Sequence, residues 1–193
     1  MTMPPAPPSD TGTDTDIDPI AATRRWLERA VIGLNLCPFA KAVHAKDQVR
    51  YVLSAATTPE ALLEELAAEL AWLAEVDPDV VDTTLIVHPH VLADFMDYND
   101  FLDQADAAVD ALGLEGEIQV ASFHPDYVFA GTYPDDAGNC TNRSPYPTLH
   151  LLREASVERA VAAFPDPDVI VERNLATLER LGEEGYWRLL QDD

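Results

Sequence analysis

The chain has 193 residues, 47% of them hydrophobic, which is enough for one domain with its own core. Its 12 basic and 35 acidic side chains give a formal net charge of −23, so the clustered lysines and arginines that bind nucleic-acid backbones are not expected. The sequence also lacks an apolar run long enough for a membrane-spanning helix, and we expect neither nucleic acid nor membrane as a partner.

The beginning of the chain predicts a tail followed by a helix. Residues 1–18 are rich in Pro and Asp and carry few large apolar side chains, so we expect a disordered, acidic tail. Residues 19–193 form the single predicted domain. Asp18 and Pro19 have the pattern of a helix N-cap followed by proline, and apolar residues at helical spacing continue to about residue 33.

Strand and helix patterns then alternate along the chain. Strands are predicted at 49–54, 83–88 and 117–123, with one helix from Pro59 to the stop signal Asp77-Pro78 and another from Phe95 to Leu112. Crossovers of this length join parallel strands. A fourth strand is predicted at 148–152, a helix at 156–164 and a last helix beginning at Asp166-Pro167. We therefore expect a single α/β domain with a three- or four-stranded, mainly parallel sheet flanked by helices.

Two of the predicted strands end in the dipeptide His-Pro, at His88-Pro89 and His124-Pro125. Ligands of open parallel sheets bind beyond the carboxyl ends of the strands. If these two strands are neighbours, their ends lie roughly 5 Å apart, and both imidazoles share one rim of the sheet. We take this rim as the predicted site.

The segment 124–147 follows the second of these strands and contains several aromatic residues but little periodicity. A segment of this length within a domain is usually functional, and we expect it to be ordered and to cover the strand ends. Arg143 is its best candidate for binding an anion, because a guanidinium can hold a carboxylate or phosphate through two hydrogen bonds. The alternative is a buried structural salt bridge.

Cys37 lies in the segment GLNLCPFAK, directly before a proline. If Pro38 begins a short helix, Cys37 occupies its N-cap and the thiol is activated as a nucleophile, for which a histidine would be the base. The alternative is a small thiol of the core. Because the sequence shows no secretory signal, we expect a cytoplasmic protein in which Cys37 and Cys140 stay reduced.

Four separated blocks, RRWLERAVIGLNLCPFAK, DYNDFLDQADAAV, QVASFHPDYVFAGT and TNRSPYPTLHLLREASVERAV, resemble the bacterial family known as domain of unknown function 1415. The resemblance covers roughly residues 20–190. It implies no particular activity, cofactor or partner. The positions of this chain within the blocks are Cys37, Pro38, His124, Pro125, Asn142, Arg143, His150 and Glu154.

These observations lead to one main hypothesis and two alternatives. The main one is a cytoplasmic enzyme that acts on a small anionic metabolite, with catalytic residues Cys37, His124 and Arg143 and substrate contacts from His88, Asn142 and Tyr127. The sequence has no dinucleotide or P-loop fingerprint, so it specifies no cofactor. One alternative is a binding or assembly module that uses the aromatic segment 124–147. The weaker one is a metal-binding protein using His88, His90 and His124, although no typical metal-ligand spacing supports it.

Overall fold

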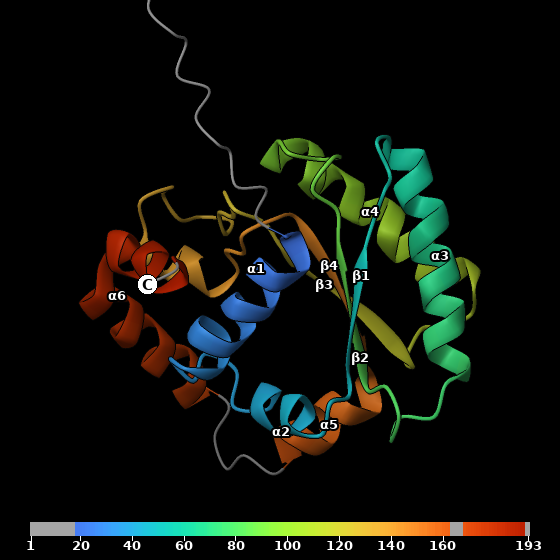
Figure 1. The fold of residues 1–193 in the computed structure, drawn as a ribbon, viewed down its shortest axis with the longest axis horizontal. Coiled ribbons are helices and arrows are strands. Elements are labelled where there is room, and N and C mark those ends of the chain that lie inside the picture. Colours follow the sequence, from blue (N-terminus) through green and yellow to red (C-terminus); the bar gives the residue numbers. More distant parts are fainter. Residues whose placement is uncertain (1–17, 163–167, 192–193) are drawn as a thin grey trace, which may run out of the picture.

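A four-stranded sheet with the strand order β1-β2-β4-β3 runs through the centre of the computed structural model, which describes residues 18–162 and 168–191 (Figure 1). The strands are β1 (Val49–Leu53), β2 (Thr83–Val87), β3 (Ile118–Phe123) and β4 (Thr148–Arg153). All four strands lie where the sequence predicts them. The α/β fold class is confirmed, and the predicted tail lies almost wholly outside the described residues.

The direction of β4 corrects one expectation. β1 and β2 are parallel, as predicted, but β4 is antiparallel to both of its neighbours, β2 and β3. The sheet is therefore mixed rather than mainly parallel. The physical reason is the connection from β3 to β4: segment 124–147 stays at the end of the sheet where β3 stops, so β4 has to run back in the opposite direction.

One face of the sheet is covered by the two 17-residue helices α3 (Pro59–Glu75) and α4 (Phe95–Ala111), seen to the right of the sheet in Figure 1. Both begin at capping residues: the Thr58 hydroxyl accepts a hydrogen bond from the Ala61 amide, and the Asp94 carboxylate accepts two from the amides of Met96 and Asp97. The buried side of α3 is a stripe of leucines with no exposed surface: Leu62, Leu66, Leu70 and Leu73. This face is a closed core.

The other face is covered by several shorter elements and one long helix. They are α1 (Pro19–Trp26), the π-helical segment η1 (Leu27–Ile32), α2 (Ala40–Ala45), α5 (Glu154–Ala162) and α6 (Asp168–Leu190), with the 3-10 segment η2 (Ala137–Thr141) packed on α6. Asp18 caps α1 as predicted, and α6 is broken at Gly182, whose φ is 70°. The predicted start of the last helix at residues 166–167 lies outside the described residues. The sequence did not indicate η2.

A second core holds α1 and α6 together on this face. Trp26 and Tyr186 are almost completely buried, and the Trp26 indole donates a hydrogen bond of 2.9 Å to the Tyr186 hydroxyl. Figure 1 shows α6 beside α1, with α2 and α5 at the lower end of the sheet. The packing of this face is thus concentrated at α1 and α6.

Candidate functional site

The predicted rim, where β2 and β3 end, does bring His88 and His124 to one edge of the sheet. Thr148 of β4 pairs with both Val87 and Phe123, so the two histidines follow strands that share an end but are not neighbours. The expected spacing of one strand is therefore wrong. The ring of Tyr98 from α4 lies between them, with its centroid 5.7 Å from the His88 ring and 5.1 Å from the His124 ring.

Both imidazoles at this rim are fully buried and bonded to backbone groups. His124 accepts a hydrogen bond of 3.0 Å from the Asp126 amide at Nδ1, which leaves Nε2 to donate to the Leu92 carbonyl at 3.2 Å. The Nδ1 atom of His88 lies 3.0 Å from the Val91 carbonyl, while Nε2 has no partner among the described residues. Burial lowers the pKa of His88 to about 4, so this ring is neutral at physiological pH, and burial also lowers the pKa of His124.

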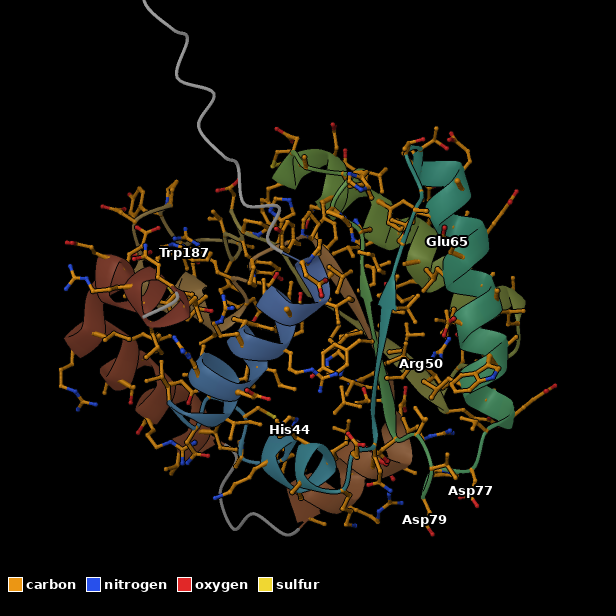
Figure 2. The ribbon with its side chains drawn as sticks, in the orientation of Figure 1. His44, Arg50, Glu65, Asp77, Asp79 and Trp187 are labelled. Carbon is orange, nitrogen blue, oxygen red and sulfur yellow. The ribbon has the colours of Figure 1, made fainter. Side chains whose placement is uncertain are left out.

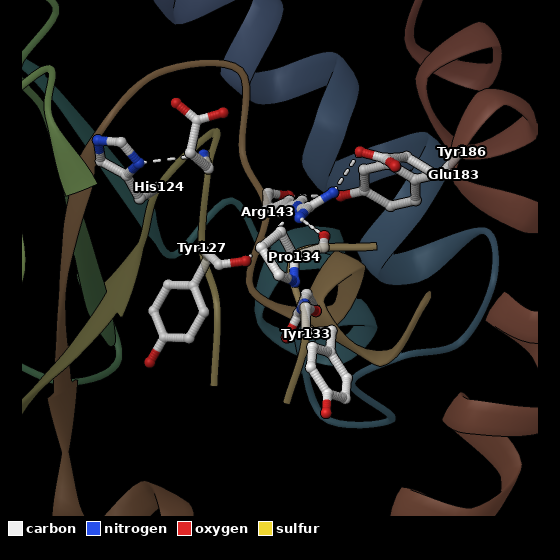
Figure 3. Close-up of polar contacts among 9 residues, drawn as sticks. His124, Tyr127, Tyr133, Pro134, Arg143, Glu183 and Tyr186 are labelled. Atoms are coloured by element: carbon white, nitrogen blue, oxygen red, sulfur yellow. Dashed lines mark hydrogen bonds and ion pairs between the residues drawn. The ribbon is translucent and has the colours of Figure 1, made fainter. Parts of the chain in front are cut away.

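Arg143 lies inside the protein rather than at a ligand site. Its side chain forms an ion pair with Glu183 of α6 and donates hydrogen bonds to the carbonyls of Pro134 and Tyr127, at 2.6 and 3.3 Å (Figure 3). Only 5% of the residue is exposed. The structure therefore matches the alternative of a buried salt bridge, and the guanidinium holds segment 124–147 against α6.

Asn142 and Tyr127, the other residues of this segment that were predicted to contact the substrate, instead stabilise the segment itself. The Asn142 amide donates a hydrogen bond of 3.0 Å to the Ser122 carbonyl. The ring of Tyr127 packs between Phe95 and Phe129, with centroids 5.1 and 4.9 Å away. None of the described residues of segment 124–147 lines the cavity of about 710 Å³ on the other side of the sheet from α3 and α4.

That cavity, of about 710 Å³, lies between the sheet and the elements α1, η1, α2 and α5. Its volume is in the range of small-molecule sites. Successive side chains of a strand point to opposite faces, so Thr83 and Leu85 of β2 and His150 and Leu152 of β4 line the cavity, while Leu151 belongs to the closed core under α3 and α4. The cavity reaches the end of the sheet where β1 and β2 begin, opposite the predicted rim.

His150 is the ionisable residue on the floor of this cavity. It pairs with Leu85 on one side and Ala121 on the other, in the middle of the sheet. Its Nε2 atom lies 2.6 Å from the hydroxyl of Thr83, which donates its proton to the Leu151 carbonyl at 2.6 Å. In this arrangement Nε2 carries the imidazole proton, so Nδ1 is the acceptor nitrogen of the ring. Burial lowers the pKa of His150 to about 4, so the ring is neutral at physiological pH.

Cys37 lies on the wall of the same cavity and is a free, partly buried thiol. The amides of Leu36 and Cys37 both donate to the Val31 carbonyl, which closes the turn after η1. The N-cap of α2 is Phe39, so the expectation that Cys37 caps a helix is wrong. The reason is that Pro38 and Phe39 belong to a turn, so the helix begins only at Ala40. Cys37 and His150 thus line the same cavity, whereas the ring nitrogens of His124 are bonded to the backbone.

The end of the cavity near α2 and α5 is polar. The hydroxyl of Ser156 donates a hydrogen bond of 2.6 Å to the carboxylate of Asp82 and accepts one of 2.9 Å from Arg159. Lys46 and Asp79 line the cavity here as well. Asp79 lies in the loop between α3 and β2, at this end of the sheet (Figure 2).

Of this site, the sequence indicated Cys37 as a candidate but neither the cavity nor a role for His150. His150 has neither a proline behind it nor a partner at a recognised spacing, and only its alternation with buried leucines on β4 places it on the opposite face. The metal alternative has no geometric support: His90 is exposed while His88 is buried, and the described residues contain no group of three or more His, Cys, Asp or Glu that could hold a metal ion.

Comparison with known proteins identifies the family. The model of the family described as protein of unknown function (DUF1415) matches residues 18–188, so the chain belongs to that family. No curated protein and no solved structure matches the chain. In the described part of the chain, no helix combines the length and the apolar character needed to cross a bilayer.

Proposed function

We propose that this member of the DUF1415 family binds a small molecule with a mainly apolar body in the cavity between the sheet and the helices α1, α2 and α5. The observation that carries the proposal is a space of about 710 Å³ with an imidazole on its floor. Its walls include large apolar side chains such as Trp26, Leu85 and Val157. Filling such a space with an apolar ligand removes that surface from water, which favours binding.

A second candidate function is catalysis in the same cavity. The enzyme hypothesis from the sequence requires a nucleophile and a base, and the cavity supplies Cys37 and His150, while His124 and Arg143 bond to other parts of the protein. In this version the Cys37 sulfur adds to a carbonyl carbon of the ligand: the S–C bond forms, the C=O π bond breaks with its electron pair going to the oxygen, and the thiol proton passes to Nδ1 of His150. The unpaired thiols of Cys37 and Cys140 also support a reducing, cytoplasmic location.

The assembly alternative has less support. Of the four aromatic residues expected to form a contiguous patch in segment 124–147, Tyr133 is 74% exposed and Phe129 is 37% exposed. Tyr127 and Tyr146 are partly buried, and Tyr127 packs on neighbouring rings. The rings therefore do not form the continuous exposed surface that a partner would need.

The binding proposal is tested by filling the cavity. Ala121 lies beside His150 on the cavity floor, and in an Ala121→Leu variant the added methyl groups occupy part of the space. Binding of the neutral dye N-phenyl-1-naphthylamine, measured by its fluorescence, is expected to weaken at least about fivefold. Ala107→Leu, at an exposed position of α4, is the matched control and should bind the dye as the wild type does. Equal dye binding by all three proteins would contradict the proposal.

The catalytic version is tested at the thiols. Cys37 lines the cavity and Cys140 is buried, with a pKa that burial raises, so iodoacetamide should modify Cys37 at least about 100-fold faster. Saturating dye should protect Cys37. If His150 accepts the thiol proton, His150→Gln slows the modification several-fold near neutral pH. An unchanged rate in that variant would remove the catalytic version and leave the binding proposal in place.

A further inference from the structure

The charged side chains of the cavity are concentrated at one end. Lys46 precedes β1, Asp79 and Asp82 precede β2, and Arg159 belongs to α5, which follows the end of β4. Because β1 is parallel and β4 antiparallel to β2, these four residues lie at the same end of the sheet. The remainder of the lining is mostly apolar, so the cavity has one polar end and an apolar body.

The two acidic residues at this end already have favourable surroundings. The carboxylate of Asp82 is buried, accepts the hydrogen bond from Ser156, and favours the charged form of the nearby Arg153. Asp79 is exposed to solvent, and its backbone carbonyl is held by the Gln48 amide at 2.8 Å. Neither carboxylate requires a cationic ligand to compensate for burial.

The two cations at this end, Lys46 and Arg159, are exposed to solvent like Asp79. Lys46 forms no ion pair with any residue that the structure describes, and Arg159 makes a hydrogen bond to the uncharged Ser156 but no ion pair within the same part of the chain. Lys46 is also one of only two lysines in a chain of net charge −23. The two cations and the two carboxylates at this end balance in formal charge, so an anion would be held by direct contact with Lys46 and Arg159 rather than by a net positive field.

A smaller cavity of about 220 Å³ adjoins this end and shares Pro78, Ser156 and Arg159 with the large one. Arg153 and Glu117 also line it. Arg153 donates through Nη2 to the carbonyls of Leu73, Val76 and Val81, but its buried Nε has no partner among the described residues. The polar end therefore continues into a small space with a second guanidinium.

We infer that the ligand is amphipathic, with its apolar body over the sheet and an anionic group, a carboxylate or phosphate, held by Lys46 and Arg159 at the α2–α5 end. This inference rests on the proposed function and specifies its ligand class. An anion at this point would form charge-assisted hydrogen bonds with Lys46 and Arg159, and the adjoining small cavity, which Arg153 also lines, provides room for the group's oxygens.

The test uses four probes with the same ten-carbon chain: decanol, decanoate, decyl phosphate and decylamine. Each displaces N-phenyl-1-naphthylamine below its critical micelle concentration. Decanoate and decyl phosphate are expected to bind at least about tenfold more tightly than decanol. Lys46→Gln and Arg159→Gln should each reduce this advantage several-fold without changing the affinity for decanol, and added salt should weaken only the anions. Lys41→Gln, at an exposed position of α2 outside the cavity lining, is the matched control and should match the wild type.

The possible failures are distinguishable. If decanol binds as tightly as the anions, the anionic group is refuted while the apolar cavity stands. Tighter binding of decylamine would assign the polar end to Asp79 and Asp82 and overturn the inference. If the dye binds but no probe displaces it, the amphipathic ligand class is wrong. Absence of dye binding by the wild type would remove the proposed function itself.

Discussion

The two faces of the sheet differ in how completely their helices cover them. α3 and α4 have 17 residues each and seal one face, and every leucine of the α3 stripe is fully buried. On the other face, α2 has six residues and α5 has nine, and neither contains a fully buried residue. A long amphipathic helix can fill the space above several strands, whereas short helices leave part of the sheet uncovered. The cavity lies over that uncovered part.

The largest effect that distinguishes the faces is expected at two neighbouring residues of β4. Leu151 is fully buried under α3 and α4, and Leu152 lines the cavity. Leu151→Ala should lower the free energy of unfolding by about 3 kcal/mol, because it leaves a void in a closed core. Leu152→Ala enlarges an existing space and should cost about 1 kcal/mol. Urea unfolding measures both, and equal losses would show that the two faces are packed alike.

Adding volume should show the opposite asymmetry. Ala105 of α4 is fully buried, and Ala105→Leu is expected to destabilise the protein by about 2 kcal/mol because the closed core has no room for the larger side chain. Ala121→Leu on the cavity floor should change stability by no more than about 0.5 kcal/mol. A destabilisation of Ala121→Leu as large as that of Ala105→Leu would contradict an open cavity.

The same contrast explains what could be predicted from the sequence. The spacing of Leu62, Leu66 and Leu70 identified α3, and the short apolar runs identified the strands, because these patterns depend only on local periodicity. The direction of β4 depends on the path of segment 124–147, which has no periodicity. The cavity depends on how far α2 and α5 extend over the sheet, and no local pattern records that.

The histidines show which single residues of a site could and could not be identified from the sequence. The sequence placed His88 and His124 at one sheet edge, and they do lie at one edge, but burial between backbone carbonyls and amides makes them structural contacts of the loops that follow β2 and β3. His150 has no distinguishing neighbour in the sequence, yet it lies on the cavity floor. The Glu183 partner of Arg143 is 40 residues away, so its buried ion pair could be stated only as an alternative.

The face that contains the cavity is not packed evenly. The part covered by α6, where Arg143 lies, is well packed. Arg143→Met removes the ion pair to Glu183 and two hydrogen bonds to carbonyls, and should lower the free energy of unfolding by about 2 kcal/mol. Arg188→Met is the matched control, since its ion pair with Glu184 on the same helix is exposed and should contribute no more than about 0.5 kcal/mol. If the two variants lose the same stability, Arg143 does not anchor segment 124–147.

The smallest expected effect is the pH dependence of stability that arises from the buried histidines of the rim. Burial lowers the pKa of His88 from 6.5 to about 4 in the folded protein, so the unfolded chain binds this proton more readily. His88 therefore does not affect the free energy of unfolding above about pH 6.5. The free energy of unfolding falls as the pH is lowered from about 6.5 to 4, and the loss between pH 6 and pH 5 is about 1 kcal/mol. His124 and His150 act in the same direction, because burial lowers their pKa values too.

His88→Asn isolates the contribution of one ring. An asparagine amide can replace the donor that faces the Val91 carbonyl, but it does not take up a proton in this range. The loss of stability between pH 6 and pH 5 should be about 1 kcal/mol smaller in His88→Asn than in the wild type, as measured by urea unfolding at each pH. His90→Asn, two residues along and exposed, should leave the wild-type pH dependence unchanged. If His88→Asn instead retains that dependence, the ring of His88 is hydrated in the folded state, and the rim is an open site like the cavity rather than a closed part of the fold.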